Sequence, residues 1–144
     1  MAAPIPVDIN KFLSKQTCVN ICCVDEENNP YCFTCFYHFD EGNNCLYFKS
    51  QMNTHHAKLL EKNGTIAGTI LEDSLDKILL KGIQLNGKAK RNSIMDINAS
   101  FKYHAKYPIA STVPGDIWSI QLEAIKFTDN GQGFGHKTHW DAAN

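Results

Sequence analysis

The sequence has no long apolar run and almost no net charge. Nowhere does the chain approach the roughly 20 consecutive apolar residues that span a bilayer, and its first residues lack the basic and then apolar pattern of an export signal. Fourteen basic and fifteen acidic side chains leave a formal charge of -1, so no global field attracts nucleic acid or an anionic membrane. We therefore expect a cytoplasmic protein without nucleic-acid or membrane partners, in which any anion site is local.

The six cysteines lack the arrangement of a disulfide framework or a zinc site. A chain without an export signal is expected to keep its thiols reduced. Cys32 and Cys35 have C-x-x-C spacing, but no second such pair follows, and in a strand residues three apart point to opposite faces. His55 and His56 are adjacent and so lack the i, i+4 spacing of helical zinc ligands. The sequence predicts reduced, structural cysteines and no metal.

The distribution of apolar residues predicts a single domain over residues 1–144. At 144 residues and 43% hydrophobic composition, the chain can bury one continuous core. Segments rich in β-branched, aromatic and cysteine residues predict strands, and apolar residues at helical spacing predict short helices. We expect helices over residues 8–15, 53–62 and 93–106, and strands over residues 17–24, 31–39, 45–50, 64–71, 77–90 and 116–128.

The order of these segments predicts a mainly β, α+β fold. The sequences DEENNP and DEGNN supply turn residues between the first three strands, which are expected to pair as an antiparallel meander. Gly82 and Gly87 indicate a close backbone approach or a bulge in the fifth strand. The glycine-rich tail GQGFGHKTHW is expected to be flexible or to face a partner. About six strands with short helices between them favour a barrel with helices attached.

The junction between the third strand and the second helix, CLYFKSQMNTHHAKLLEKNG, is the stretch most informative about function. The first amides of a helix lack intrahelical partners and carry the positive end of the helix dipole, which suits a phosphate. Ser50 and Thr54 can donate beside them, and Lys49, His55 and His56 can supply positive charge. Taken alone, a Ser or Thr before a helix is more often an ordinary N-cap.

This junction resembles the hallmark of the pyridoxamine 5'-phosphate oxidase-like superfamily of flavin mononucleotide (FMN) proteins. The segment LYFKS corresponds to its aromatic pair and threonine, with Ser50 at the threonine. QMN corresponds to the three-residue spacer, and THH to the Ser-Arg-Lys triplet. The resemblance implies that Ser50, Thr54, His55 and His56 hold the FMN phosphate. Because the histidines replace Arg and Lys, phosphate affinity is expected to depend on pH. Over about residues 8–140 the chain is most similar to an uncharacterised bacterial subgroup of the superfamily.

The resemblance extends to the strand before the junction, where the family's Arg-x-Val-Leu-Leu-Lys segment contacts the flavin. The matching segment here is CFTCFY. It implies that Phe33, Thr34 and Cys35 line the flavin through their backbone, while Cys32 and Tyr37 replace the two basic residues. Backbone contacts do not require a particular side chain, so these three residues are expected to serve as cofactor contacts.

The C-terminal segments KFTDNG and KTHWD are similar to the family's Glu-Phe-Trp-Gln-Gly and Arg-Leu-His-Asp-Arg signatures. Lys137 and His139 fall at the family's substrate-contacting Arg and His. With the neighbouring Trp140 they are the predicted substrate-binding residues. Thr128 stands where the family has a flavin-contacting Trp, so we expect a reaction other than the oxidation of pyridoxamine phosphate.

Taken together, the resemblance implies a six-stranded antiparallel split β-barrel with short flanking helices, which forms a homodimer with FMN at the subunit interface. The function implied is that of a flavin-dependent oxidoreductase acting on an unidentified small molecule. The alternatives are a non-catalytic protein that binds or stores flavin or haem, and a dimeric module whose cofactor site has decayed. The sequence identifies no catalytic residue.

Overall fold

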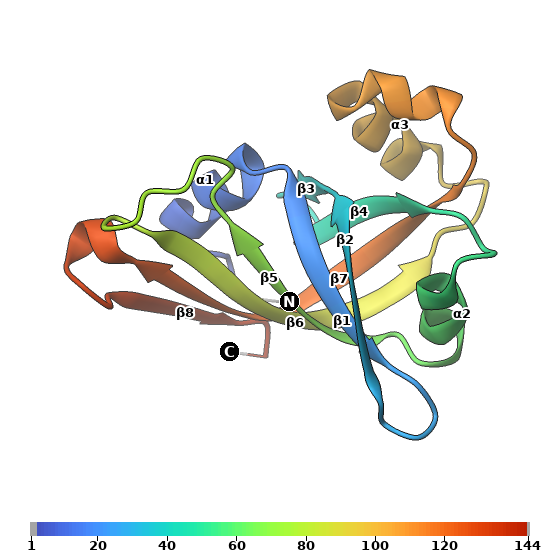
Figure 1. Ribbon diagram of the computed structural model, residues 1–144. Coiled ribbons are helices and arrows are strands. Elements are labelled where there is room, and N and C mark those ends of the chain that lie inside the picture. The colour runs from blue at the N-terminus through green and yellow to red at the C-terminus, as the bar shows by residue number, and fades with distance from the viewer. Residues whose placement is uncertain (1–2, 144) are drawn as a thin grey trace.

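The structure, a computed structural model, describes residues 3–143 and consists of one curved antiparallel sheet with three α-helices (Figure 1). The helices are α1 (Val7–Lys15), α2 (His55–Lys62) and α3 (Ile97–Lys106), with 3₁₀ turns η1 (Pro108–Thr112) and η2 (Asn130–Gln132). The strands are β1 (Cys18–Val24), β2 (Pro30–Phe36), β3 (His38–Asp40), β4 (Cys45–Ser50), β5 (Thr65–Leu71), β6 (Lys81–Arg91), β7 (Asp116–Asp129) and β8 (Lys137–Asp141).

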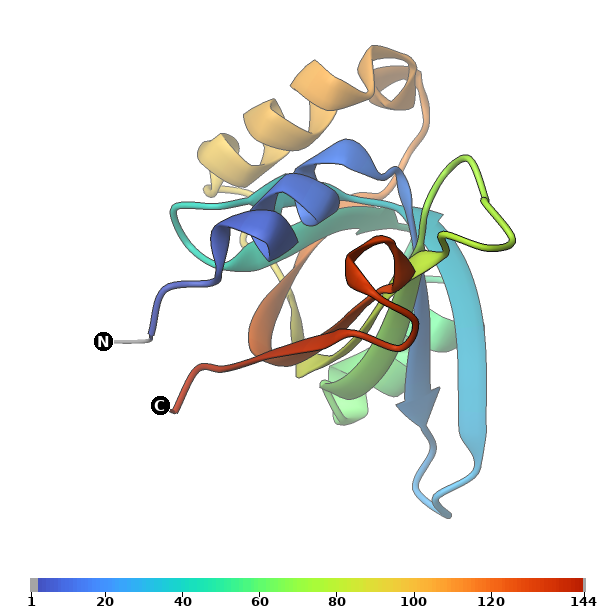
Figure 2. The same ribbon diagram turned by 90° about the vertical axis from the view of Figure 1, so that its left-hand side faces the viewer.

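The strands form a single half-barrel sheet. Their order is β2-β1-β5-β6-β7-β4-β3, and β8 adds to β7 beside this path. All of the pairings are antiparallel. The sheet curls so that its strands wrap around a common interior, which is visible when Figures 1 and 2 are compared. The predicted mainly β, α+β class is therefore confirmed.

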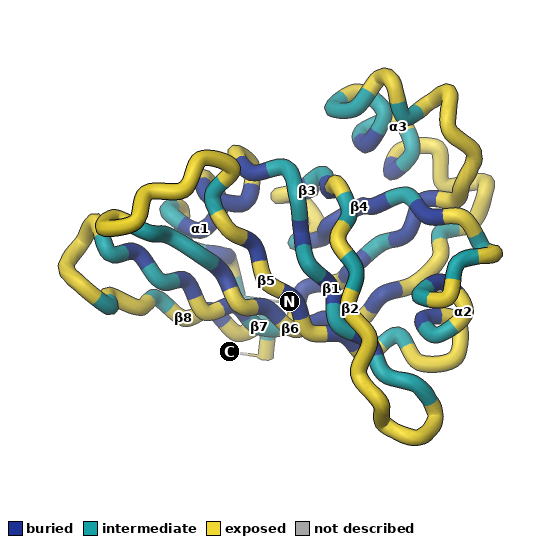
Figure 3. The backbone as a smooth tube through the Cα atoms, viewed as in Figure 1, coloured by how far each residue is buried: buried dark blue, intermediate teal, exposed yellow. Residues whose placement is uncertain are grey.

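Alternation of apolar and polar residues creates the interior of the half-barrel. In β5, Ile66 and Ile70 are buried while the residues directly beside them are exposed, as expected for a strand with one covered face. Helix α1 adds Ile9, Phe12 and Leu13 from one of its faces to the same core. Figure 3 shows the buried positions along the central strands, whereas β2 and the β1–β2 turn are largely exposed.

The prediction of six strands is wrong, because residues 3–143 form eight. The expected strand over residues 31–39 is divided into β2, which pairs with β1, and β3, which pairs with β4. The chain changes partner at Tyr37, whose side chain is fully buried and donates a hydrogen bond to the Leu13 carbonyl at 2.7 Å. A continuous meander is thus replaced by two separate hairpins on opposite margins of the sheet.

The C-terminal tail is also ordered differently from the prediction, because Lys137–Asp141 forms β8 along β7. Trp140 is buried in the main core, and its indole Nε1 donates to the Ala3 carbonyl at 2.9 Å. Because burial of a large aromatic side chain is strongly favourable, Trp140 stabilises the attachment of the tail. The tail is therefore part of the sheet and of its core.

The expected close approach at Gly87 is present between β6 and β7. The register shifts between Asn86 and Gly87, and a Cβ built on Gly87 would lie 2.5 Å from the Gln121 carbonyl oxygen. No other residue type fits this position without a shift of the backbone. The long predicted strand begins later than expected, at Lys81, because Asp76 Oδ1 accepts from the amides of Ile78 and Leu79 and holds that segment in a turn.

Helix α3 lies on the outer face of the sheet, against β4 and β7 (Figure 1). It begins at Ile97 rather than at residue 93, since the Asp96 side chain accepts from the Ala99 amide at 3.3 Å and caps the helix there. A small apolar cluster beneath it is separate from the main core and consists of Cys45, Tyr47, Ala99, Tyr103 and Ile117.

Candidate functional site

The strand-to-helix junction predicted to bind phosphate is formed by the end of β4 and the start of α2. Thr54 occupies the N-cap position, where its Oγ1 accepts from the Ala57 amide at 3.3 Å and donates to the Gln51 carbonyl at 2.8 Å. Ala57 and Leu60 are buried and fix the helix to the sheet. Thr54 is therefore an ordinary helix cap, and this role holds its hydroxyl group at the N-terminus of α2.

Three of the predicted phosphate residues converge at this junction, and we call Ser50, Thr54 and His56 the hydroxyl–imidazole cluster. Ser50 Oγ lies 2.5 Å from His56 Nε2 and 3.4 Å from Thr54 Oγ1, which is itself 3.3 Å from the same imidazole nitrogen. Within residues 3–143, the amides of His55 and His56 at the start of α2 donate to no protein acceptor. Hydroxyl, imidazole and amide donors are thus available at one helix start.

His56 is held in a half-buried, largely apolar position. Its ring stacks on Phe33 of β2, with a centroid separation of 3.8 Å and an interplanar angle of 10°. Burial lowers the pKa of His56, and the neighbouring His55 lowers it further. A lowered pKa favours the uncharged imidazole, in which only one of the two nitrogens carries a proton. Nearby negative charge would favour the protonated form.

Lys49 and His55, two other predicted cofactor residues, point elsewhere. Lys49 precedes Ser50 on β4 and so faces the other side of the sheet, where its Nζ lies 3.0 Å from His104 Nε2 and donates to the Ala110 carbonyl at 2.8 Å. The structure does not bring Lys49 to the hydroxyl–imidazole cluster. His55 stands edge-on to Tyr31 at a centroid distance of 4.8 Å, beside the cluster.

The predicted flavin-contacting residues Phe33, Thr34 and Cys35 lie on β2, at the margin of the sheet. The Tyr37 amide donates to the Thr17 carbonyl at 2.9 Å, and this bond determines which β1–β2 residue pairs are hydrogen-bonded and which are not. Thr34 then occupies a position where the backbone amide and carbonyl face away from β1. No other described strand pairs with β2. An extended ligand beside the cluster can therefore hydrogen-bond to the backbone of Thr34.

No family model matches the sequence. The UPF0306 protein YhbP of Salmonella paratyphi B is 35% identical to this chain over 133 residues, which cover 92% of the chain and 90% of YhbP. This chain belongs to the UPF0306 family. YhbP of Salmonella newport matches this UPF0306 protein to the same extent.

Solved structures with low sequence identity share the fold of this UPF0306 protein. A haem-binding protein from Mycobacterium smegmatis aligns with a TM-score of 0.78 and 12% identity, over 98% of this chain and 60% of that one. An FAD-binding protein from Mesorhizobium loti aligns at 0.72 and 12% identity, over 85% and 93%. A pyridoxinephosphate oxidase family protein from Clostridium acetobutylicum aligns at 0.69 and 13% identity, over 95% and 94%. The fold is thus that of the split-barrel proteins.

The predicted substrate residues Lys137, His139 and Trp140 lie on β8, at the opposite end of the sheet from α2 (Figure 1). Lys137 Nζ donates to the Gly135 carbonyl at 3.0 Å, and Trp140 is buried. His139 lines a cavity of about 630 Å³ together with Trp140 and residues of β6 and β7. A single chain does not bring these three residues to the hydroxyl–imidazole cluster.

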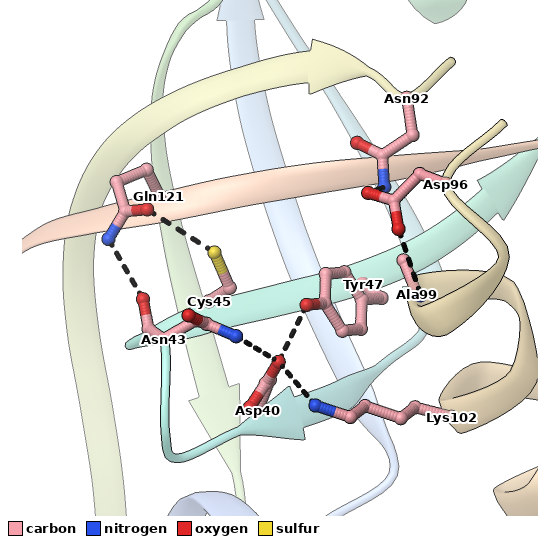
Figure 4. A network of polar contacts seen from close by, with 9 residues as sticks. All are labelled: Asp40, Asn43, Cys45, Tyr47, Asn92, Asp96, Ala99, Lys102 and Gln121. Carbon is pink, nitrogen blue, oxygen red and sulfur yellow. Dashed lines mark hydrogen bonds and ion pairs between the residues drawn. The ribbon is translucent and has the colours of Figure 1, made fainter.

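A polar network around Asp40 was not anticipated from the sequence (Figure 4). The buried Asp40 carboxylate accepts from Tyr47 at 2.6 Å, Asn43 at 2.8 Å and Lys102 at 3.0 Å. Burial alone would raise its pKa, but these hydrogen bonds and the Lys102 charge outweigh burial and lower the pKa to about 2. Asp40 and Asn43 read as turn residues, and nothing in the sequence indicated that Lys102, 62 residues later, meets them.

The donor set of the cluster suits an anion better than a metal. Among residues 3–143, no group of three or more His, Cys, Asp or Glu side chains is arranged to hold a metal ion. The hydroxyl–imidazole cluster offers two hydroxyls and a neutral imidazole, which suit an anionic group with several acceptor oxygens.

Among the helices of residues 3–143, none combines the length and apolar character needed to span a bilayer.

Proposed function

We propose that this UPF0306 protein binds FMN, with the cofactor's phosphate at the hydroxyl–imidazole cluster. The observation that carries the proposal is the convergence of Ser50, Thr54 and His56 within 3.4 Å of one another at the start of α2. The split-barrel fold, which an FAD-binding protein and a pyridoxinephosphate oxidase family protein share, supports a flavin as the ligand. The match of the sequence to the superfamily's phosphate motif supports FMN in particular.

The chemistry of the donor set fits a phosphate monoester. Ser50 and Thr54 each have a hydroxyl proton that now serves a neighbour within the protein and can turn to a phosphate oxygen. The free amides of His55 and His56 add fixed donors at the positive end of the helix dipole. A bound dianion favours protonation of His56, which then donates a charge-assisted hydrogen bond.

The free edge of β2 supports a flavin ring beside this phosphate site. The backbone amide and carbonyl of Thr34 face the open side of the strand, and Phe33 and Cys35 flank them. These groups can orient a planar heterocycle through hydrogen bonds that need no particular side chain. When bound, the isoalloxazine of FMN supplies two-electron chemistry. The chain itself binds and orients the cofactor, and we assign no side chain as acid or base.

The proposal includes a homodimer in which each FMN lies between two subunits. A single chain holds the cluster at one end of the sheet and the predicted substrate residues Lys137 and His139 at the other (Figure 1). A second copy can bring its own β8 to the first copy's α2, which a single chain cannot do. Exposed apolar side chains of β2 and β5, Phe36 and Leu71, are each more than half accessible and are suited to such burial.

The activity we propose is oxidation or reduction of a small organic molecule in the cytoplasm by the flavin-loaded dimer. The second candidate is binding or storage of flavin or haem without catalysis. It is favoured by the alignment with the mycobacterial haem-binding protein, whose TM-score of 0.78 exceeds those of the FAD-binding and pyridoxinephosphate oxidase family proteins. The exposed imidazole of His55 is available as a haem ligand.

Titration with paired ligands tests the proposal. Purified protein is titrated with FMN, with riboflavin, which lacks the phosphate, and with haemin, while absorbance and the melting temperature are followed. Tight FMN binding that weakens strongly for riboflavin supports a phosphate site, and its loss in His56→Ala locates that site. Absence of any thermal shift or spectral change at saturating FMN contradicts the proposal. Binding of haemin alone supports the second candidate, and steady oxidation of reduced nicotinamide by the FMN-loaded protein argues against it.

A further inference from the structure

Five of the six cysteines lie on the β1–β2 hairpin. The register places Cys22 directly opposite Cys32, whereas Cys18 faces Phe36, Cys35 faces Val19 and Cys23 faces Tyr31. Residues directly opposite each other on antiparallel strands project from the same face of the sheet. Cys22 and Cys32 are therefore the one directly opposed pair of thiols in this hairpin.

The burial of the hairpin distinguishes this pair from the other cysteines. Alternate residues of β1, Val19, Ile21 and Cys23, are buried in the core, so Cys22 lies on the outer face, where it is partly accessible and Cys32 is exposed. Cys35 is three residues from Cys32 and so faces the interior, as its pairing with Val19 requires. It cannot pair with Cys32 or with the outward-facing Cys18 without turning the strand over.

The hydrogen-bond pattern of the hairpin brings the Cys22 and Cys32 thiols close together. The Tyr37 amide donates to the Thr17 carbonyl, and the Asp25 amide donates to the Asn29 carbonyl at 3.0 Å. Hydrogen-bonded and non-hydrogen-bonded pairs alternate along an antiparallel ladder, so these two hydrogen bonds make Cys22 and Cys32 a non-hydrogen-bonded pair. This class has the shorter Cα separation, about 4.5 Å. That separation lies within the range of roughly 4.4–6.8 Å found for disulfides.

Further observations support this assignment of the pair. Pro30, which has no amide hydrogen, and the side-chain hydrogen bond from Asn20 to Thr34 at 3.1 Å both occupy pairs of the same class. The neighbouring Cys32 thiol, followed by burial, raises the pKa of the Cys22 thiol. Because β2 is a margin strand, it can also move slightly toward β1 without breaking another strand pair.

We propose that Cys22 and Cys32 are a modification site that forms a reversible cross-strand disulfide on reaction with a small-molecule disulfide, such as oxidised glutathione. The Cys32 thiolate attacks one sulfur of the oxidant, whose S–S bond breaks and releases one thiol. The Cys22 thiolate then attacks the Cys32 sulfur of this mixed disulfide and releases the second thiol. The protein loses two electrons and two protons, and the oxidant gains both pairs.

The disulfide would close the β1–β2 hairpin next to Phe33, which stacks on His56. Cys32 is adjacent in sequence to Phe33, so oxidation would change the strand that contacts His56 of the hydroxyl–imidazole cluster. Formation of the disulfide does not require that the protein binds FMN. Reduction by excess thiol reopens the hairpin, since each step is an exchange reaction.

Alkylation of the folded full-length protein tests this site. The protein is incubated with oxidised glutathione, quenched with acid, unfolded and alkylated, and its intact mass is measured. The six alkylated thiols of the reduced protein are expected to fall to four, without a glutathione adduct. Proteolysis should then link the peptides that contain Cys22 and Cys32. Retention of six alkylated thiols in the oxidised wild type overturns the proposal.

Single substitutions separate this pair from its neighbours. Cys32→Ser and Cys22→Ser should each form a glutathione adduct or remain fully alkylated, with no internal disulfide. Cys23→Ser and Cys18→Ser are the matched controls, and both should still lose two alkylatable thiols, since neither residue belongs to the pair. An internal disulfide that persists in Cys32→Ser, or disappears in Cys23→Ser, assigns the bond to different cysteines and contradicts the inference.

Discussion

The side chains of two adjacent β4 residues lie in two different regions of this protein. Lys49 faces α3, where it meets His104 and the Ala110 carbonyl, and Ser50 faces α2, where it meets His56. In the α3 region, hydrogen bonds join lysines to a buried carboxylate and to main-chain carbonyls. In the α2 region, two hydroxyls and an imidazole mostly satisfy one another.

This difference separates scaffold from site. Lys102 binds the buried Asp40, and Lys106 donates to the carbonyls of Gln16 and Tyr37, so each ammonium fixes α3 to the sheet. Moving one of these ammonium groups to a ligand would remove a donor from the buried Asp40 carboxylate or from a main-chain carbonyl. The donors of the hydroxyl–imidazole cluster can be redirected with little such loss, because most of their present partners are also donors that can turn to the same ligand.

The largest expected effect is on the scaffold side. Asp40→Ala should lower the free energy of unfolding by about 3 kcal/mol, because it leaves the buried Tyr47 hydroxyl and the Lys102 ammonium without their shared acceptor. Urea unfolding measures the change. Wild-type protein should also lose this contribution as the pH falls from about 4 towards 2, since the Asp40 pKa is lowered to about 2 when folded.

Asp40→Asn is the matched variant for the acid range, because an amide does not ionise there. Its unfolding free energy should be lower than that of the wild type at neutral pH, and the difference should shrink as the pH approaches 2. A difference that stays constant with pH would mean that the Asp40 charge does not stabilise the α3 region.

The next effect should appear on the site side. Thr54→Ala combined with His56→Ala should weaken FMN binding roughly 30-fold, about 2 kcal/mol, through the loss of two hydrogen bonds to a charged group. Isothermal titration calorimetry measures the affinity. Lys49→Ala is the control from the same strand, and it should lower stability while leaving FMN affinity unchanged. Equal loss of FMN affinity in the double variant and in Lys49→Ala would contradict the assignment of FMN binding to the α2 region alone.

Thr54 also has a structural role, which a single substitution isolates. Thr54→Ala should cost about 1 kcal/mol of unfolding free energy, because the Ala57 amide loses its cap. Thr54→Ser keeps the hydroxyl group and should restore most of this stability, together with FMN affinity. Thermal or urea unfolding of the two variants checks the prediction. A Thr54→Ala protein as stable as the wild type would mean that the cap does not support α2.

The smallest expected effect is a pH dependence of FMN affinity. Burial and His55 lower the pKa of His56 in the free protein, and a bound phosphate raises it, so binding takes up protons and should strengthen about threefold as the pH falls from 8 to 6. The phosphate itself titrates near pH 6. Comparison with His56→Ala, which keeps only that titration, therefore isolates the imidazole. Identical pH profiles would exclude His56 as the titrating contact.

The sequence was most informative where the signal is local. Alternation predicted β5 and the middle of β6, and the capping preference of Asn53 or Thr54 predicted the start of α2 to within two residues. The motif around Ser50 and His56 identified residues that do converge. Lys49 is adjacent to Ser50 in sequence, but the alternating geometry of a strand places its side chain on the other face of the sheet.

What the sequence by itself determined is a mainly β domain with a short helix starting beside two hydroxyls and two histidines, since these follow from periodicity and capping within a few residues. Only the tertiary structure decided that residues 31–39 divide at Tyr37, that the tail completes the sheet as β8, and that Lys102 reaches Asp40. Those outcomes depend on which distant segments offer a free strand edge, an apolar core for Trp140 or a buried carboxylate. No short window of sequence contains that information.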